Sequence, residues 1–545
     1  MGSKITFLFL LFIIFFGSFL RLANLNGNPN GLYVDEASPA VNARLIAQTG
    51  KDEYGKEYPL SFRFLGSYTP PLYTYVTSLI SHNGEPSIFI ARLTSAISGI
   101  LLIIVIFIFT KVLGMNNITS LFTTFIFTIS PGAIFYSRIG YEINLGFLLY
   151  SLGCLFLYLS LNNQKFLSLG FGILALSIYA YHTQKLLVPF TIILFLLIFR
   201  KKFFSKKIVK NLLFSFILFV LFILPQIFIF FTPANTSRGV GLFYKEAIFQ
   251  QASLMNIPIL VSVPISFLRE FTSQYFAYFS PRNLFFQPDS DLQRSLPELS
   301  IFYPWMVILY LVGIFVLIKQ AKLNKGKFTV MLFLLAPIPA SLTGDPFATQ
   351  RALILILPLI LIMAYGLQYL PKKGLVLVFL LSIFSMISLY RSLAVLLPNE
   401  RAKIWGYGFS QLAEEIKKRP DEKFLIDSGR IKPAYIILAF FLKIPPEKLQ
   451  LAADPNIKND YYNNTLWNDH YIITNFETRS ISWEEDIYKD QILVGDELAI
   501  SQAQAKEHFL TKLFEIKSPN KEIIFLGFKT NPELKCKSSF DSKRC

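Results

Sequence analysis

Apolar runs recur along the first 391 residues of the chain, and polar stretches separate them. A helix needs about 20 mostly apolar residues to cross the roughly 30 Å hydrocarbon core of a bilayer. Windows of that length predict eleven membrane-spanning helices, near residues 5–22, 87–110, 116–135, 143–161, 166–180, 185–199, 210–231, 300–318, 328–343, 352–370 and 374–391. The first run lacks a small-residue cleavage site, so we expect a retained span rather than a removed signal peptide.

Two of the polar stretches are long, near residues 23–86 and 232–299. The first has helix-like patterns at Glu36–Gln48 and Pro70–Ile80. The second is aromatic and amphipathic at Leu242–Phe249 and Ile265–Phe279. Amphipathic segments of this kind lie along a membrane surface, which is where we expect both loops.

The chain changes character after Arg391. Short apolar runs begin at Phe424, Tyr471 and Ile523 and predict buried strands, and helical patterns lie at Gly408–Lys418 and Ser501–Lys512. The sequence therefore predicts a polytopic α-helical membrane domain, residues 1–391, followed by a soluble α/β domain, residues 392–545.

Composition supports the membrane class, and the charge distribution predicts its orientation. The chain is 53% hydrophobic and only 16% charged, yet carries a formal charge of +17. The tail holds as many acids as bases, so the excess belongs to the membrane part, in short gaps such as Arg200–Lys210, Lys319–Lys327 and Lys372–Lys373. Short loops rich in Lys and Arg face the cytoplasm. We therefore expect a multi-pass plasma-membrane protein with a cytoplasmic N-terminus, an extracytoplasmic tail and no nucleic-acid partner.

The acidic residues of the membrane part lie on the side opposite to the basic loops. In the predicted topology all of them fall on the external side: Asp35, Glu36, Asp52, Glu53, Glu57, Glu85, Glu142, Glu246, Glu270, Asp289, Asp291, Glu298 and Asp345. Proton-driven transporters usually carry ionisable residues at mid-membrane depth. The one-sided distribution counts against a transporter.

Several stretches together carry a resemblance to a known family. They are GLYVDEASPAVNARLIAQTGKDEYGKEYPL, FLGSYTPPLYTYV, IARLTSAISG, YSRIGYE, YAYHTQKLLVP and TQRALILILPLIL, in this order over roughly residues 1–370. The chain resembles the C-superfamily of membrane glycosyltransferases, and within it family 39, which includes protein O-mannosyltransferases and lipid A aminoarabinose transferases. The resemblance implies that a hexosyl or pentosyl group moves from a polyprenyl-phosphate carrier to a protein, lipid or glycan acceptor on the outer face of the membrane.

The resemblance also assigns roles to individual residues. Asp35 matches the family's catalytic acid, and a carboxylate suits the base that accepts the acceptor's proton. Glu36 is expected to support it by hydrogen bonding. The alternative is that both acids only stabilise the start of a surface helix through its dipole.

Cations are expected to stabilise the phosphate that leaves the sugar. Arg138 matches an active-site arginine of the family, and Lys185 or Arg351 would complete a phosphate clamp. The alternative is that these side chains extend to lipid headgroups. His182 is a further phosphate or sugar ligand, or an ordinary hydrogen-bonding residue.

The neighbours of Arg138 are expected to support the site. If the stretch is helical, Glu142 shares a face with Arg138, and Tyr141 belongs to the same motif. Glu142 then orients Arg138 or is a second acidic residue of the site; the alternative is an ordinary surface pair. One position departs from the family: many relatives have a lysine before the Pro-Pro of the first loop, where this chain has Thr69. Either Arg63 supplies the missing cation, or the geometry of the phosphate site differs from that of the relatives.

The sequence says less about metals, disulfides and other functional classes. Two carboxylates can hold Mg²⁺ or Mn²⁺, but family 39 members are thought to work without metal, so we expect no cofactor. Cys154 is expected in the core, and a Cys536–Cys545 disulfide is left open. Two other functional classes remain as alternatives: a transporter or flippase of lipid-linked saccharides, and a non-catalytic sensor whose tail binds a ligand.

Overall fold

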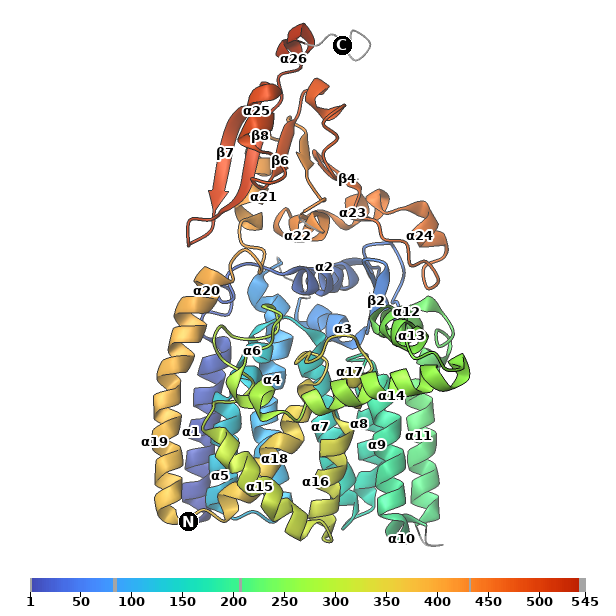
Figure 1. Ribbon diagram of the computed structural model, residues 1–545, viewed down its shortest axis with the longest axis vertical. Helices are drawn as coiled ribbons and strands as arrows, with labels where there is room; N and C mark the ends of the chain where they lie inside the picture. Colours follow the sequence, from blue (N-terminus) through green and yellow to red (C-terminus); the bar gives the residue numbers. More distant parts are fainter. Residues whose placement is uncertain (1, 82–85, 205–207, 431–432, 539–545) are drawn as a thin grey trace. The chain divides into compact units, whose positions relative to one another are not determined.

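The computed structural model describes residues 2–81, 86–204, 208–430 and 433–538 (Figure 1). These residues form two compact units. The membrane unit comprises the chain up to Ala23, Thr69–Tyr73 and Arg92–Ala394. The loop–tail unit comprises Asn24–Tyr68, Thr74–Ala91 and the chain from Val395 onward. The sequence leaves a Cys536–Cys545 disulfide open, and Cys545 lies outside the described ranges. Glu85 lies outside them as well.

The membrane unit is a helical bundle, and every predicted span coincides with a helix. The helices are α1 (Ser3–Leu22), α4 (Ile88–Val112), α5 (Asn117–Ile129), α6 (Pro131–Arg138), α7 (Glu142–Ser160), α8 (Lys165–Ile178), α9 (Gln184–Ile198), α10 (Arg200–Phe203), α11 (Val209–Ile227), α15 (Met306–Gln320), α16 (Asn324–Leu335), α17 (Ile338–Ser341), α18 (Ile356–Gln368) and α19 (Lys372–Tyr390). These apolar helices are those of a multi-pass membrane protein.

Only some of these helices are long and apolar enough to cross a membrane alone. Among the described residues, α1, α4, α7, α11 and the continuous helix Lys372–Glu400 meet that condition. The pair α5 and α6 makes a sixth when counted as one span, bent by 54°. The bend falls at Ser130–Pro131, because proline lacks the N–H that would continue the ladder and disfavours helical backbone in the residue before it. The count of eleven spans stays a prediction.

Small residues allow two of the shorter apolar helices to pack closely. A Cβ atom on Gly366 of α18 would overlap the Leu309 carbonyl of α15, and one on Gly313 of α15 would overlap the Ile362 carbonyl of α18. Glycine at such positions lets membrane helices approach to backbone contact. The α15–α18 pair is therefore fixed by its glycines.

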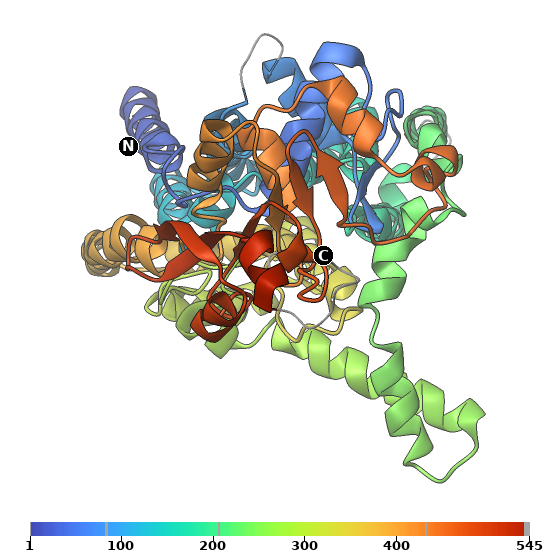
Figure 2. The ribbon, with the colours of Figure 1, turned by 90° about the horizontal axis from the view of Figure 1, so that it is seen from above.

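The second long loop is largely helical. It contains α12 (Pro233–Leu242), α13 (Lys245–Ser253), α14 (Ile259–Ala277) and a π-helical turn, η1 (Arg282–Phe286). Figure 2 shows green helices of this segment projecting from the bundle. Leu260 and Leu268 of α14 are strongly exposed, as a helix lying in a membrane interface requires.

The loop–tail unit is built on a mixed six-stranded sheet in the order β4-β5-β3-β6-β8-β7. Its central strands β5 (Phe476–Thr478), β3 (Phe424–Ile426) and β6 (Ile492–Gly495) are parallel, and the outer strands β4 (Tyr471–Ile473), β8 (Ile523–Lys529) and β7 (Thr511–Lys517) are antiparallel to their neighbours. The remaining elements are α2 (Val34–Thr49), β1 (Phe62–Phe64), β2 (Ser67–Thr69), α3 (Leu72–Ile80), α20 (Leu397–Glu400), α21 (Phe409–Lys418), α22 (Ala434–Phe441), α23 (Pro446–Ala452), α24 (Pro455–Asn459), α25 (Gln502–Glu507) and α26 (Pro532–Ser538).

The strands predicted at Phe424, Tyr471 and Ile523 are confirmed, as is the helix ending at Lys418. The predicted helix Ser501–Lys512 is too long. Helix α25 ends at Glu507, and Phe509 adopts a positive φ of 55° that breaks the helical path. Thr511–Lys517 then pairs with β8 as an edge strand.

The first loop and the tail share one hydrophobic core. Val34, Val41 and Leu45 of α2 pack in the same cluster as Leu412 of α21 and Ile437 of α22. This compact unit is therefore larger than the predicted tail domain, residues 392–545, since it also takes in most of the first loop. Burial of the apolar side of α2 fixes the element that carries Asp35.

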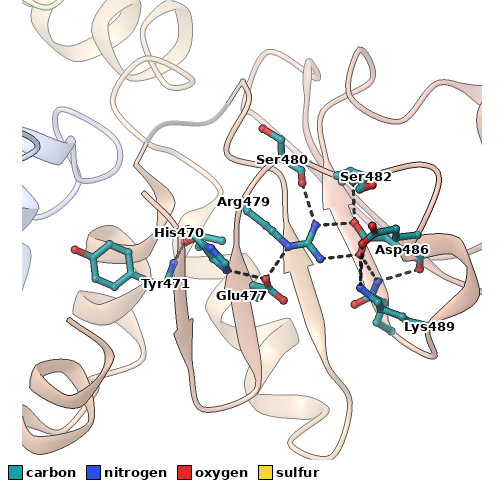
Figure 3. Close-up of polar contacts among 12 residues, drawn as sticks. His470, Tyr471, Glu477, Arg479, Ser480, Ser482, Asp486 and Lys489 are labelled. Carbon is teal, nitrogen blue, oxygen red and sulfur yellow. Dashed lines mark hydrogen bonds and ion pairs between the residues drawn. The ribbon is translucent and has the colours of Figure 1, made fainter. Parts of the chain in front are cut away.

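A partly buried ion-pair network connects the end of β5 to the segment before β6 (Figure 3). Both terminal nitrogens of Arg479 donate to Asp486 at 2.7 Å, and Arg479 Nε donates to Glu477 at 2.6 Å. Burial alone would raise the pKa of Asp486, but the donors from Arg479 and the Ser482 N–H lower it to about 2. The network stabilises the tail and uses acids that play no part in the candidate site.

Candidate functional site

Helix α2 carries the two acids singled out in the first loop. The Glu36 side chain is fully buried, and its Oε2 accepts a hydrogen bond from the Tyr33 N–H at 3.2 Å. This bond caps the start of α2. Asp35 is partly exposed in the first turn of the same helix. Glu36 therefore has a clear structural role, while Asp35 keeps access to solvent.

Two glycines let the backbone before α2 meet the start of the tail. Gly31 has φ +120°, and a Cβ on it would overlap the Trp405 carbonyl and lie 2.7 Å from the Tyr407 N. Gly406 has φ +72°, and a Cβ on it would lie 2.5 Å from the Leu32 carbonyl oxygen. We call this reciprocal backbone approach the glycine contact. It places the tail against the segment that leads into Asp35.

A second acidic pair lies deep in the loop–tail unit. Asp52 Oδ2 accepts a hydrogen bond from the Tyr461 hydroxyl at 2.6 Å. Glu53 accepts one from Asn42 Nδ2 and one from the Tyr435 hydroxyl, both at 3.0 Å. Two tyrosines of the tail therefore attach to two carboxylates of the first loop. Sequence reasoning placed these acids on the external side but did not single them out.

Burial dominates the titration of this pair. It raises the pKa of Asp52 to about 6, although the Tyr461 hydroxyl and backbone N–H groups oppose the rise. It raises the pKa of Glu53 to about 7, where Asn42 opposes the rise and the charge of Asp52 adds to it. The folded unit therefore takes up protons at a pH where the unfolded chain does not.

The free energy of unfolding of the loop–tail unit is expected to fall as pH rises from 5 to 8. Each pKa is raised on folding, so the stabilising proton is fully bound below pH 4 and is lost through about pH 6 and 7. The loss is on the order of 2–4 kcal/mol for the coupled pair. Thermal unfolding of the detergent-solubilised protein, followed by intrinsic fluorescence, measures it.

Glu53→Gln cannot ionise; its amide oxygen can accept from Asn42 Nδ2, and its amide N–H can donate to the Tyr435 hydroxyl. Its unfolding midpoint should therefore vary less between pH 5 and 8. The Asp486 network does not interfere, because the low pKa of Asp486 confines its effect to more acidic solution. A midpoint that rises with pH in the wild type would contradict the assignment.

Arg63 is held within the loop–tail unit. Its Nη2 donates to the Leu466 carbonyl, its backbone N–H donates to the Tyr461 hydroxyl at 3.0 Å, and its guanidinium lies over the Tyr54 ring, 5.4 Å from the centroid. The side chain is buried. These contacts give Arg63 a structural role in joining the first loop to the tail. Thr69 ends β2 and belongs to the membrane unit.

Arg138 lies at the end of α6 and is buried. Its Nη1 donates to the Leu20 carbonyl at 2.8 Å and its Nη2 donates to the Ala23 carbonyl at 2.9 Å. A cation at these carbonyls satisfies the C-terminal end of α1 and its dipole. Arg138 therefore fixes the end of the first membrane helix.

Two further buried arginines lie within electrostatic reach of Arg138. They are Arg21 of α1 and Arg92 of α4. Arg21 Nη1 donates to the Gly17 and Thr128 carbonyls, whereas its Nε and Nη2 have no hydrogen-bond partner among the described residues. We call the three the arginine cluster. Sequence reasoning missed Arg21 and Arg92; an arginine near the end of an apolar span was the available signal.

The expected pairing of Glu142 with Arg138 is wrong. The helix breaks between them, since α6 ends at Arg138 and α7 begins at Glu142, so helical spacing does not apply. Glu142 lies 4.0 Å from Arg238 of α12 instead. Tyr141 is buried immediately before α7, and its backbone carbonyl accepts a hydrogen bond from Ser95 Oγ at 3.0 Å.

Lys185 lies in the first turn of α9, and its Nζ donates to Asn235 Oδ1 at 2.5 Å. No carboxylate lies within ion-pair distance of it in the described parts of the chain. The positive end of a helix dipole adds to its charge. His182 is partly buried in the turn before α9, and its ring lies 6.4 Å from that of Tyr181. The start of α9 is thus a positively charged segment.

Arg351 has an acidic neighbour. Arg351 Nη2 lies 2.9 Å from Asp345 Oδ2, and Arg294 Nη2 lies 3.1 Å from the same oxygen. Arg294 also pairs with Asp291 at 3.1 Å. Sequence reasoning did not identify Arg294. The charge of Arg351 is therefore largely compensated by Asp345.

The predicted residues fall into different units. Asp35, Glu36 and Arg63 belong to the loop–tail unit, and Arg138, Glu142, Lys185, His182 and Arg351 belong to the membrane unit. Within the described ranges, no group of three or more His, Cys, Asp or Glu side chains is arranged to hold a metal ion.

No family model matches the chain, and no curated protein matches its sequence. Solved structures do match. ArnT from Cupriavidus metallidurans in the apo state is 12% identical, with 98% of this chain and 99% of that chain covered and a TM-score of 0.46. ArnT bound to undecaprenyl phosphate gives a TM-score of 0.44 at 11% identity, with 96% of this chain and 98% of that chain covered.

The Archaeoglobus fulgidus oligosaccharyltransferase, tethered to an acceptor peptide, is 11% identical, with 97% of this chain and 74% of that chain covered. Its TM-score is 0.51. These proteins are glycosyltransferases of the GT-C type. The chain therefore has the GT-C fold, as the sequence resemblance predicts.

Proposed function

We propose that this protein is an integral membrane glycosyltransferase that moves a sugar from a polyprenyl-phosphate carrier to an acceptor on the extracytoplasmic face of the membrane. The observation that supports this most is the GT-C fold, matched over 97% of the chain. Asp35 follows the first membrane helix in sequence and keeps partial solvent access in the first turn of α2. The resemblance to family 39 favours a single sugar on a monophosphate carrier.

In the proposed reaction Asp35 accepts the proton of an acceptor hydroxyl. The oxygen of that hydroxyl attacks the anomeric carbon, and the bond between this carbon and the phosphate oxygen breaks. The electron pair leaves with the carrier phosphate, which becomes more negative and must be stabilised by cations. The reaction therefore has two requirements, a base and cations.

The arginine cluster supports a phosphate in the membrane unit. Arg138 repels both Arg21 and Arg92, and two nitrogens of the buried Arg21 lack a hydrogen-bond partner among the described residues. An anion would stabilise the buried charge of Arg21. Arg138, which also holds α1, would act from within this cluster.

Lys185 is the second proposed phosphate ligand. It has no carboxylate partner in the described chain, whereas the charge of Arg351 is compensated by Asp345. We therefore rank Lys185 ahead of Arg351, His182 and Arg63 as the cation that complements Arg138.

Lys185→Gln is expected to weaken donor binding about 10-fold or more, because one charge-assisted hydrogen bond to phosphate is lost. The measurement is the donor KM in a transfer assay. Lys165→Gln is the matched control, since Lys165 also begins an apolar helix but lies in a predicted cytoplasmic gap. Equal KM values for the two variants would remove Lys185 from the phosphate site.

The proposed function is tested by incubating the purified protein with a panel of polyprenyl-phosphate sugars and detecting released carrier phosphate by mass spectrometry. Release from at least one donor is expected, and it should persist in chelator because we propose a metal-independent reaction. Movement of intact donor across a vesicle membrane without release would instead support a flippase. Binding of a ligand by the tail without release or movement would support a sensor.

A further inference from the structure

A small cavity of about 190 Å³ lies within the loop–tail unit. Its apolar side is formed by Val34 of α2, Ile437 of α22 and Phe525 of β8, all of which are buried. Tyr33 and Tyr407 contribute aromatic rings to the lining. The volume is below the range of sites for drug-sized ligands, so the cavity suits one ring-sized group rather than a lipid chain.

The polar side of the cavity is lined by two cations, Arg430 and Lys403, and one carboxylate, Asp496. Arg430 Nε lies 3.0 Å from both carboxylate oxygens of Asp496. Asp496 Oδ1 also accepts the N–H groups of Leu498 at 3.1 Å and Ala499 at 2.9 Å, whereas its Oδ2 accepts only from Arg430 among the described residues. Asp496 thus orients Arg430, and the two N–H groups hold the carboxylate in place.

Two donor groups remain for a ligand. The terminal nitrogens of Arg430 have no protein partner in the described part of the chain, and its side chain is 46% exposed. Lys403 also lines the cavity and pairs with Glu522 at 2.8 Å. A planar guanidinium fork matches a carboxylate or phosphate group. Aromatic rings beside such a fork suit the apolar face of a sugar.

We propose that this cavity binds one anionic sugar residue, a saccharide ring that carries a carboxylate or a phosphate, and that it forms part of the acceptor site. The identification as acceptor rests on the proposed function; the binding itself does not.

The position of the cavity in the chain supports an acceptor rather than a donor ligand. Val34 lines the cavity, and Asp35 is the next residue, so their Cα atoms are about 3.8 Å apart. The base must lie beside the acceptor hydroxyl. The glycine contact joins Gly31 to Trp405 and Tyr407, and thereby fixes Tyr33 and Tyr407 as walls of the same cavity.

The test measures binding by the full-length protein in detergent with ligand-observed NMR. The probes are glucuronic acid, glucose 6-phosphate, glucose and inorganic phosphate. At least one anionic sugar should bind about tenfold or more tightly than glucose, because it adds charge-assisted hydrogen bonds. The two anionic sugars distinguish carboxylate from phosphate recognition. Equal binding of glucose overturns the proposal, and so does inorganic phosphate that binds as tightly as either sugar.

Arg430→Gln should weaken binding of the preferred sugar about tenfold or more. Lys417→Gln, which changes an exposed lysine of α21 paired with Glu414, should leave it unchanged. Because Arg430→Gln could disturb the Asp496 loop, Tyr407→Leu provides a second variant that keeps that pair, removes an aromatic ring from the lining and should also weaken binding. Unchanged affinity in both cavity variants overturns the proposal. If the protein releases carrier phosphate but binds no anionic sugar, the proposed glycosyltransferase function stands and the cavity proposal fails. If it binds an anionic sugar but releases no carrier phosphate, only the proposed function fails.

Discussion

Replacing Asp35 by Asn is expected to reduce sugar transfer by about 10²–10⁴-fold, the usual contribution of a general base. The amide keeps the size of the side chain but cannot accept the acceptor's proton at neutral pH. Asp35 lies partly exposed in the first turn of α2, so the folded state should tolerate the change. The initial rate of carrier release at saturating donor measures the effect.

Glu36→Gln is the informative comparison. Glu36 is buried and caps α2 through the Tyr33 N–H, and a glutamine oxygen can accept the same bond. We expect a much smaller loss of rate for Glu36→Gln, with a lower unfolding temperature as its main effect. If Asp35→Asn retains a rate close to wild type, Asp35 is not the base.

The sequence predicts the helices far better than the contacts of the charged residues. Each apolar run became a helix because a membrane span satisfies its backbone hydrogen bonds internally. The helix break at Ile139–Tyr141 was not predictable from a period count, and it separates Arg138 from Glu142. The two residues therefore make contacts with other segments.

Long-range packing explains the other unpredicted features. Apolar alternation identified three strands of the tail, but Val34, Val41 and Leu45 of α2 join the tail core from a distant part of the sequence. In the sequence Asp52 and Glu53 resemble ordinary loop acids, but in the structure Tyr461 and Tyr435 bind and bury them. Neither contact follows from a local pattern, because the partners are separated by about four hundred residues in sequence.

Gly31→Ala is expected to destabilise the loop–tail unit by about 2–5 kcal/mol. Part of this cost is the positive φ of +120°, which a side chain disfavours. The rest is the overlap of the new methyl group with the Trp405 carbonyl, a backbone atom that cannot rotate away. Thermal unfolding of the solubilised protein and protease sensitivity of the segment before α2 measure the effect.

Gly55→Ala separates the two contributions. Gly55 lies in the same unit with φ +85°, but nothing lies within 4 Å of the position that a methyl group on it would take. Its substitution should cost only the backbone term, about 1–2 kcal/mol. Gly406→Ala, which places a methyl 2.5 Å from the Leu32 carbonyl oxygen, should behave like Gly31→Ala.

The glycine contact also bears on catalysis, because Asp35 lies four residues after Gly31. If the contact positions the base, Gly31→Ala and Gly406→Ala should lower the rate of transfer at temperatures where both proteins remain folded. Gly55→Ala should leave that rate unchanged, since Gly55 is distant in sequence and outside the contact. Equal unfolding temperatures for Gly31→Ala and Gly55→Ala would show that the close backbone approach at Gly31 does not contribute to stability. The tail would then not hold the segment that carries Asp35.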